Sequence, residues 1–391
     1  MTQALEGLTI LDLSRMIGPF CSMFFSDMGA DVIKVEEAQL RWLRGAPHGE
    51  EKARVFRHVE RNKRSVALNL KTKEAQEVFH KLAKSADVVL EDFRPGVTQR
   101  LGIDYDTLKE INPRIIYCAI SGYGQDGPYR LLPGHDPNYM SVGGVMGITA
   151  TPDGQFVLPG VPIGDFGGGS MHAAIGILIA LQARERTGRG QFVDISMTDG
   201  VVAWLGARHG QYYFGEGLAP KRGERVTYVY ECKDGKHISL APAEPWFWEH
   251  LCQAVGKPEY IPHKIATFPS FEPENPKQAE ILAYFKEVFK TKTRDEWFKI
   301  LWEVDTCVAP VNSFDEAFQD PQVTHRKMLL EMEHPEFGKI RQPGISIKLS
   351  DTPGEVRTLP PQRGQHTDEL LLGLGYSKER IAEMRQGGMI A

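Results

Sequence analysis

Short apolar runs alternate with longer helical patterns through the first half of the chain. Runs rich in Val, Ile and Leu predict strands at 8–13, 31–35, 65–68, 87–90, 114–120 and 191–195. Apolar positions at helical spacing predict helices at 19–28 and 73–85, a short helix after Pro95 and a long apolar helix at 170–184. This alternation is typical of strand-helix-strand units and predicts a parallel sheet covered by helices.

The pattern changes near residue 225. The predicted elements there are short strands at 228–230 and 237–240, a helix start at Pro245, and helices near 278–291 and 293–303. The tail from Glu331 is rich in Pro and Gly, and a further strand is predicted at 344–348.

These patterns predict an α/β fold with a second, smaller domain. A chain of 391 residues exceeds the size of roughly 250 to 300 residues at which single cores stop growing. We therefore expect a Rossmann-like large domain at 1–205, a small α+β domain at 225–325, and a C-terminal segment at 330–391 that returns to the large domain.

Charge and cysteine content restrict the class of partner. The net charge of −5 is spread along the chain, which argues against nucleic acid and against a polybasic membrane contact. The five cysteines are scattered and form no Cys-x-x-Cys pair, so neither a disulfide framework nor a zinc site is expected. The chain start lacks a basic segment followed by an apolar run. We expect a soluble, cytoplasmic protein with a small-molecule partner and no metal.

Nucleotide-binding motifs are missing from the sequence. No Gly-x-Gly-x-x-Gly follows the first predicted strand, and no Gly-x-x-x-x-Gly-Lys-Ser/Thr occurs anywhere. The sheet alone does not name a ligand, because one fold serves many functions.

A histidine and a carboxylate stand in two glycine-flanked turns. His135 follows Gly134, and Asp165 follows Gly164 and precedes Gly167-Gly-Gly169. Two groups that each carry a proton, supplied to one cleft, can remove a proton from one face of a carbon and return it to the other. The plainer alternatives are a surface histidine without a role and an aspartate that caps a helix.

The three glycines after Asp165 favour a functional interpretation. Each glycine lowers helix propensity by roughly 1 kcal/mol, and we attribute this cost to close approach of a ligand. Backbone N–H groups left open at a helix N-terminus would hold an enolate or tetrahedral oxyanion. Glu244 precedes a predicted helix and is either a third member of the site or a charge that favours the helix start.

Four methionines stand near these turns in the sequence. They are Met140, Met146, Met171 and Met197. Flexible thioethers suit a pocket for a variable acyl chain, although core packing is the favoured explanation.

The chain resembles the class III CoA-transferase superfamily over nearly its whole length. The resemblance is carried by Gly29-Ala-Asp-Val-Ile-Lys34, Asn62-Lys-Arg-Ser-Val-Ala-Leu-Asn-Leu-Lys71, Asp92-Phe-Arg-Pro-Gly-Val-Thr-Gln-Arg100, Ser121-Gly-Tyr-Gly-Gln-Asp-Gly-Pro128, Thr187-Gly-Arg-Gly-Gln191 and Gly364-Gln-His-Thr-Asp-Glu-Leu370. It implies two interlocked ring-like subunits, and hence a homodimer, each with a large Rossmann-like and a small domain.

Three landmarks resemble the alpha-methylacyl-CoA racemases within that superfamily. They are Gly134-His-Asp-Pro-Asn-Tyr139, Gly164-Asp-Phe-Gly-Gly-Gly169 and Glu244-Pro245. The resemblance implies that His135 and Asp165 are the two acid/base groups and that Glu244 orients the imidazole. The activity implied is inversion of the alpha-carbon of a 2-methylacyl-CoA thioester by 1,1-proton transfer. The alternative is a CoA-transferase, in which Asp165 forms an acyl anhydride and an aromatic residue usually stands at position 135.

The resemblance also implies how coenzyme A is held, and no cofactor beyond the CoA of the substrate. Leu68 and Lys71 would contact the adenosine end, Asp92, Phe93 and Arg94 the pantetheine path, and Arg100 a phosphate. Two departures stand out. Glu37 replaces an arginine often found in racemases, and the turn at 14–19 is one residue short.

Overall fold

The structure is a computed structural model that describes residues 2–38, 58–149, 155–206, 229–264 and 276–391. The chain divides into two compact units. The first contains residues 1–146, 158–210 and 324–391, and the second contains 147–157 and 211–323. Each unit is described by itself below.

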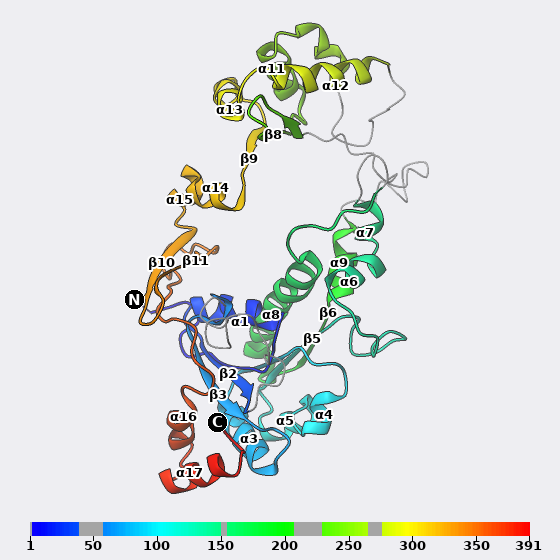
Figure 1. The fold of residues 1–391 in the computed structure, drawn as a ribbon. Helices are drawn as coiled ribbons and strands as arrows, with labels where there is room; N and C mark the ends of the chain where they lie inside the picture. Colours follow the sequence, from blue (N-terminus) through cyan, green and yellow to red (C-terminus); the bar gives the residue numbers. More distant parts are fainter. Residues whose placement is uncertain (1, 39–57, 150–154, 207–228, 265–275) are drawn as a thin grey trace. The chain divides into compact units, whose positions relative to one another are not determined.

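A six-stranded parallel sheet forms the first unit and confirms the predicted sheet (Figure 1). Its strands, in spatial order, are β3 (Lys63–Leu68), β2 (Asp31–Glu37), β1 (Thr9–Asp12), β4 (Val88–Glu91), β5 (Ile116–Ser121) and β6 (Phe192–Ser196). Ile10 of β1 is in register with Val32 of β2 and Val88 of β4. The strand order reverses between β1 and β4, and ligands of open α/β sheets bind outside the carboxyl ends of the strands at such a point.

Alternate residues of each strand point to opposite faces of the sheet, which explains two separate cores. On one face Leu11 and Tyr117 pack against α3 (Lys73–Ser85), α5 (Tyr105–Ile111), α16 (Thr367–Gly373) and α17 (Lys378–Gln386). On the other face Ile10 and Cys118 pack against α1 (Gly18–Asp27) and α8 (His172–Thr187). Because both faces are covered, the central strands β4 and β5 are continuously apolar over 88–90 and 116–120 rather than alternating.

Side-chain caps set where several of the helices begin. The hydroxyl of Thr72 accepts the N–H of Ala75 at the start of α3, and the carboxylate of Asp104 accepts the N–H of Thr107 at the start of α5. Ser196 caps α9 (Met197–Trp204) in the same way, so the chain turns directly from β6 into this helix. Such caps typically stabilise a helix by about 1 kcal/mol.

The strand predicted at 344–348 is wrong. The tail instead forms a hairpin of β10 (Leu329–His334) and β11 (Gly338–Pro343), whose last pair joins Leu329 to Pro343. Gly344 passes close to the main chain of Lys327, and its N–H bonds to Met328. Residues beyond Gly344 therefore run past the start of β10, where the hairpin offers no partner strand.

The second unit is a small antiparallel sheet covered by helices. The sheet has the order β7 (Val229–Glu231), β8 (His237–Leu240) and β9 (Val308–Val311), and residue 228, where a strand was predicted to begin, lies outside the described residues. The helices are α11 (Pro245–Ala254), α12 (Pro276–Phe289), α13 (Arg294–Glu303) and α14 (Phe314–Gln319) with the 3-10 helix η3 (Pro258–His263). Their aromatic core includes Trp248, Phe285 and Phe289.

Candidate active site

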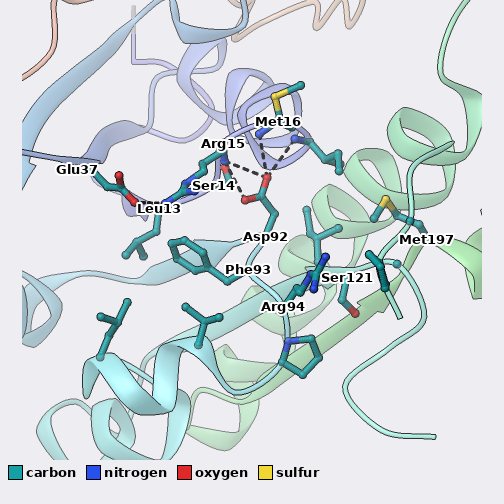
Figure 2. A pocket seen from close by; sticks show the side chains of 18 of the residues that line it. Leu13, Ser14, Arg15, Met16, Glu37, Asp92, Phe93, Arg94, Ser121 and Met197 are labelled. Carbon is teal, nitrogen blue, oxygen red and sulfur yellow. Dashed lines mark hydrogen bonds and ion pairs between the residues drawn. The ribbon is translucent and has the colours of Figure 1, made fainter. Parts of the chain in front are cut away.

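A cavity of about 1110 Å³ lies at the carboxyl ends of the parallel strands, at the switch point of the sheet. Residues that directly follow β1, β3 and β4 line it, together with the ends of β2 and β5. The start of α6 (Asp136–Val142) and Asp165 complete the wall. Figure 2 shows part of this lining, with Asp92 at the centre of a hydrogen-bond cluster.

Hydrogen bonds with Asp92, and with the buried Asp12 and Lys34, hold the turn after β1. Asp92 accepts the backbone N–H groups of Arg15, Met16 and Ile17 at 2.9 to 3.1 Å (Figure 2). Beneath the turn, the buried Asp12 carboxylate accepts the Ser14 N–H at 2.9 Å, and a buried ammonium, Lys34, donates to the Ser14 carbonyl. In the turn that is one residue short in the sequence, the backbone N–H groups of residues 14 to 17 are therefore all hydrogen-bonded within the fold.

Buried charges below this turn balance one another. Burial alone raises the pKa of Asp12, but Lys34 and Lys63, with nearby hydroxyls, hold the pKa of this carboxyl well below its usual range. Burial lowers the pKa of Lys34, and the surrounding carboxylates outweigh it, so the pKa of this ammonium is raised. Both partners stay charged near neutrality, which fixes the floor of the cavity electrostatically.

The segment 92–94 forms one wall of the cavity, where the resemblance predicts the pantetheine path. The Asp92 carboxylate is already occupied by the turn after β1, so its observed role is to shape that turn. Behind it, Glu91 accepts the Phe93 N–H at 2.6 Å, and burial raises the pKa of Glu91 to about 8. Phe93 also carries the Arg15 guanidinium over its ring, 5.4 Å from the ring centre.

Arg15 places a guanidinium beside Glu37, the residue that departs from the racemase pattern. The two side chains form an ion pair at the edge of the cavity (Figure 2). Both are more than 40% exposed, so this pair contributes little to stability. The pair matters for the local charge, because Arg15 supplies a cation at this edge of the cavity although residue 37 is acidic.

Further cations line the cavity. Lys71, Arg94, Arg100 and Arg130 all reach it and are exposed. The structure gives none of these four side chains an ion pair among the residues it describes. Leu68, by contrast, is buried and contributes apolar wall. Lys and Arg without carboxylate partners suit the phosphates of a nucleotide-like ligand.

Removing a cavity cation should weaken binding of the CoA moiety. A hydrogen bond to a charged group is worth about 1.5 to 3 kcal/mol, so Arg100→Ala and Lys71→Ala should each raise KM roughly 10- to 100-fold with little change in kcat. The matched control is Lys109→Ala, since Lys109 lies on α5 and pairs with Asp106. An unchanged KM in both cavity variants would contradict this assignment.

His135 lies at the N-terminal end of α6 and lines the cavity as an exposed side chain. Asn138 accepts the backbone N–H of His135 at 3.0 Å, and the Tyr139 hydroxyl donates to the Gly134 carbonyl. A Cβ at Gly134 would lie 2.8 Å from the Tyr139 ring, so only glycine fits there. Asn138 and Tyr139 therefore fix the main chain that carries the imidazole.

Asp165 lies in the first turn of the π-helix η2 (Gly164–Met171), which continues into α8. The N-cap residue of this helix is Ile163 and not Asp165, and among the described residues the buried Oδ1 of Asp165 has no hydrogen-bond partner. Burial and the nearby carboxylates of Asp136 and Asp92 raise the pKa of Asp165 to about 6, against the opposing charge of His135. A half-buried carboxyl with such a pKa can both accept and donate a proton near neutrality.

The expected role of the three glycines is wrong. A Cβ at Gly167 would lie 2.3 Å from the Trp204 ring, and one at Gly168 would lie 2.6 Å from the Met197 carbonyl. The glycines therefore permit close packing of η2 on α9. The first N–H groups of η2 are also not open, because Asp136 accepts those of Gly164 and Asp165. The predicted oxyanion donors are thus occupied by the protein itself.

The packing of η2 on α9 makes a testable stability prediction. A Cβ at Gly200 would lie 2.3 Å from the main-chain oxygen of Gly168, so Gly200→Ala should lower the free energy of unfolding by about 1 to 3 kcal/mol. Gly206→Ala is the control, because a Cβ at Gly206 would meet nothing within 4 Å. Chemical denaturation measures both, and equal stability of the two variants would contradict the packing argument.

Glu244 belongs to the second unit. It precedes the first residue of α11 without capping that helix by its side chain, and it is half-buried. The predicted hydrogen bond between Glu244 and His135 joins residues of different units and stays a prediction.

The methionines separate into different environments. Met197 lines the cavity, whereas Met140 and Met146 pack in a small core with Val201. Met171 is exposed. Of these four methionines, Met197 alone lines the cavity, where Met16 of the turn after β1 also lies. Among the described residues, no group of three or more His, Cys, Asp or Glu side chains is arranged to hold a metal ion.

Comparisons with known proteins identify the family that has this fold and this site. The family model for CoA-transferase family III matches residues 5–367. The Succinyl-CoA:glutarate CoA-transferase of Homo sapiens is 32% identical over 99% of this chain and 90% of its own length. An Acyl-CoA transferase of Fusarium pseudograminearum is 34% identical over 99% of this chain and 88% of its own.

Solved structures agree with these relatives. A CAIB/BAIF family protein from Brucella suis has a TM-score of 0.81 and 28% identity, covering 96% of this chain and all of its own. Rv3272 of Mycobacterium tuberculosis has a TM-score of 0.80 and 26% identity, covering 94% of this chain and 99% of its own. The chain belongs to CoA-transferase family III.

Proposed function

We propose that the protein is an acyl-CoA racemase or epimerase that inverts the alpha-carbon of 2-methylacyl-CoA thioesters. The observation that carries this proposal is that His135 and Asp165 lie at the N-terminal ends of two helices and line the same cavity. An imidazole and a carboxyl of raised pKa are suited to exchange roles as acid and base.

The reaction breaks and remakes one carbon-hydrogen bond. One group removes the alpha-proton as the thioester becomes an enolate, and the other delivers a proton to the opposite face, so the thioester stays intact. Asp165 acts as base in one direction when ionised and as acid in the other when protonated, and a pKa of about 6 gives it both forms near neutrality. The cations at Lys71, Arg94 and Arg100 would hold the CoA moiety.

A CoA-transferase is the second candidate, and the names of the relatives favour it. Its first step would be attack of the Asp165 carboxylate on the thioester carbonyl, which forms an acyl anhydride and releases CoA thiolate. The thiolate would then attack the aspartyl carbonyl of the anhydride, which forms an aspartyl-CoA thioester and releases the donor acid. The acceptor carboxylate would attack this thioester to form a second anhydride and release the thiolate. Attack of the thiolate on the acceptor acyl carbon would give the new acyl-CoA and free the Asp165 carboxylate. The unpartnered Oδ1 of Asp165 is compatible with this role as well.

One experiment separates these candidates. The protein is incubated with one enantiomer of a 2-methylacyl-CoA, with and without a free carboxylic acid. A racemase produces the opposite enantiomer in both reactions. A transferase produces a new acyl-CoA, and only when the acid is present.

A homodimer is part of the proposal, and an exposed apolar face supports it. Ile175, Leu178 and Ile179 of α8 are 48 to 63% exposed, whereas the opposite side of the helix packs on the sheet. By length and composition the stretch Gly164–Thr187 could also span a membrane, but it carries Asp165 and packs on β5 and β6. Contiguous exposed apolar residues of this kind mark an interaction surface, and we assign it to a second copy of the chain.

The dimer should persist at high dilution. A large, largely apolar interface of the kind found in obligate dimers resists dissociation, so sedimentation at submicromolar concentration should show only dimer. Denaturant should cause dissociation and unfolding in one transition. A stable folded monomer would contradict the assignment of this face.

A further inference from the structure

Asp136 connects the two helix starts that carry the candidate acid/base groups. It is the first residue of α6, directly after His135, and it is only 9% exposed. Its Oδ1 accepts the backbone N–H of Gly164 at 2.5 Å and that of Asp165 at 3.1 Å. The carboxylate therefore points away from its own helix and onto the first turn of η2.

We propose that Asp136 is a positioning residue that fixes the main chain of Asp165 relative to His135 and controls the charge of Asp165 by its own negative charge. The proposal rests on the function proposed for Asp165, and it holds for either chemistry, because an acid/base and a nucleophile both depend on these two properties. Asp136 need not touch the substrate.

The geometry supports both parts of this role. The same oxygen receives two N–H groups, so a small movement of Asp136 would release both and leave the η2 start unanchored. Glycine at position 164 leaves room for this contact, because the Cβ of any other residue there would lie only 3.0 Å from the Asp136 oxygen. A displacement of about 1 Å in a catalytic group typically costs roughly 10²-fold in rate.

The charged groups around Asp165 come from few elements. His135 and Asp136 at the start of α6 and Asp92 after β4 act on it, and Tyr139 of α6 lies in the field of Asp165. On β6, burial and the charges of Asp126 and Asp199 raise the pKa of Asp194. His172 of α8 bonds to the Gly167 carbonyl. Of the carboxylates, Asp136 has the largest effect and raises the pKa of Asp165, so its removal should lower that pKa.

Two substitutions separate position from charge. Asp136→Asn keeps an oxygen that accepts both N–H groups but removes the charge. Asp136→Ala removes both. Asp126→Asn is the matched control, because Asp126 is exposed, lies outside the cavity lining and acts on Asp194 instead.

Activity and chemical labelling provide two independent measurements. The first is the pH profile of alpha-proton exchange or, if the protein proves to be a transferase, of CoA transfer. The second is labelling of Asp165 by a water-soluble carbodiimide and an amine, located by fragment mass spectrometry. The carbodiimide reacts with the protonated carboxyl, so labelling follows its titration without substrate.

The expected results differ between the two variants. Asp136→Asn should retain activity, with its acidic limb and its labelling curve both moved to lower pH. Asp136→Ala should lose roughly 10²-fold in kcat/KM although the protein stays folded by circular dichroism. Asp126→Asn should match the wild type in both measurements.

Several outcomes would overturn the proposal. An Asp136→Ala variant with wild-type activity would remove the positioning role. An Asp136→Asn variant with an unmoved labelling curve would remove the electrostatic role, even if its activity fell. Failure of the proposed function itself looks different, because the wild type would then exchange no alpha-proton while the labelling curves still separate the variants.

Discussion

Replacing Asp165 by asparagine should abolish measurable catalysis. Loss of one general acid/base typically costs ~10² to 10⁴-fold in rate, and asparagine is neither a base nor a nucleophile at this position. The prediction holds for alpha-proton exchange and for CoA transfer alike. The measurement is kcat/KM at pH 7.5 for both reactions with the same acyl-CoA.

The thermal stability of Asp165→Asn serves as the folding control, and the direction of its change can be predicted. Burial raises the pKa of Asp165, so this carboxyl ionises less readily in the folded protein than in the unfolded chain. Its ionisation therefore lowers the free energy of unfolding as the pH rises above the pKa that Asp165 has in the unfolded chain. The neutral amide should therefore be at least as resistant to heat as the wild type at pH 7.5. Asp126→Asn should keep full activity. Near wild-type rates in Asp165→Asn would remove Asp165 from both candidate mechanisms.

Replacing His135 by alanine should abolish racemisation but only weaken a transferase. In a 1,1-proton transfer the imidazole is one of two obligatory acid/base groups, so exchange should fall ~10² to 10⁴-fold. In a transferase the nucleophile is Asp165, and His135 acts only through its charge and the space it fills. The measurement is the rate of alpha-proton exchange beside the rate of CoA transfer in the same variant.

A histidine outside the cavity is the appropriate comparison. His80 lies on α3 and bonds to the Gly102 carbonyl, so His80→Ala tests for a general effect of losing an imidazole. It should leave exchange unchanged. If His135→Ala exchanges the alpha-proton at the wild-type rate, the racemase assignment is wrong.

The parallel sheet could be predicted from the sequence because its central strands β4 and β5 are buried on both faces. Runs such as 88–90 and 115–120 are continuously apolar, and helices with clear caps separate them. The strand predicted at 344–348 is wrong because its formation depends on a partner strand and not on its own sequence pattern. Its apolar residues alternate correctly, but pairing depends on how far a neighbouring strand extends, and no local pattern contains that information.

The candidate site could be predicted only in part. Histidine and aspartate beside glycines gave His135 and Asp165, and the cavity contains both. Asp136 was missed although it follows His135 directly, because an acidic residue in the first turn of a helix usually serves that helix. The glycines after Asp165 were wrongly attributed to the approach of a ligand. Their contacts with α9 involve residues about 30 positions further along the chain, which a local sequence pattern does not reveal.

The most direct test follows the thioester and the Asp165 peptide in deuterated water. The protein is incubated with one enantiomer of a 2-methylacyl-CoA and a carboxylic acid, then treated with hydroxylamine or borohydride and examined by mass spectrometry. The racemase account predicts recovered thioester with deuterium at the alpha position and an unmodified Asp165 peptide. A mass change on that peptide, together with CoA passed to the added acid and no deuterium in the thioester, would contradict it.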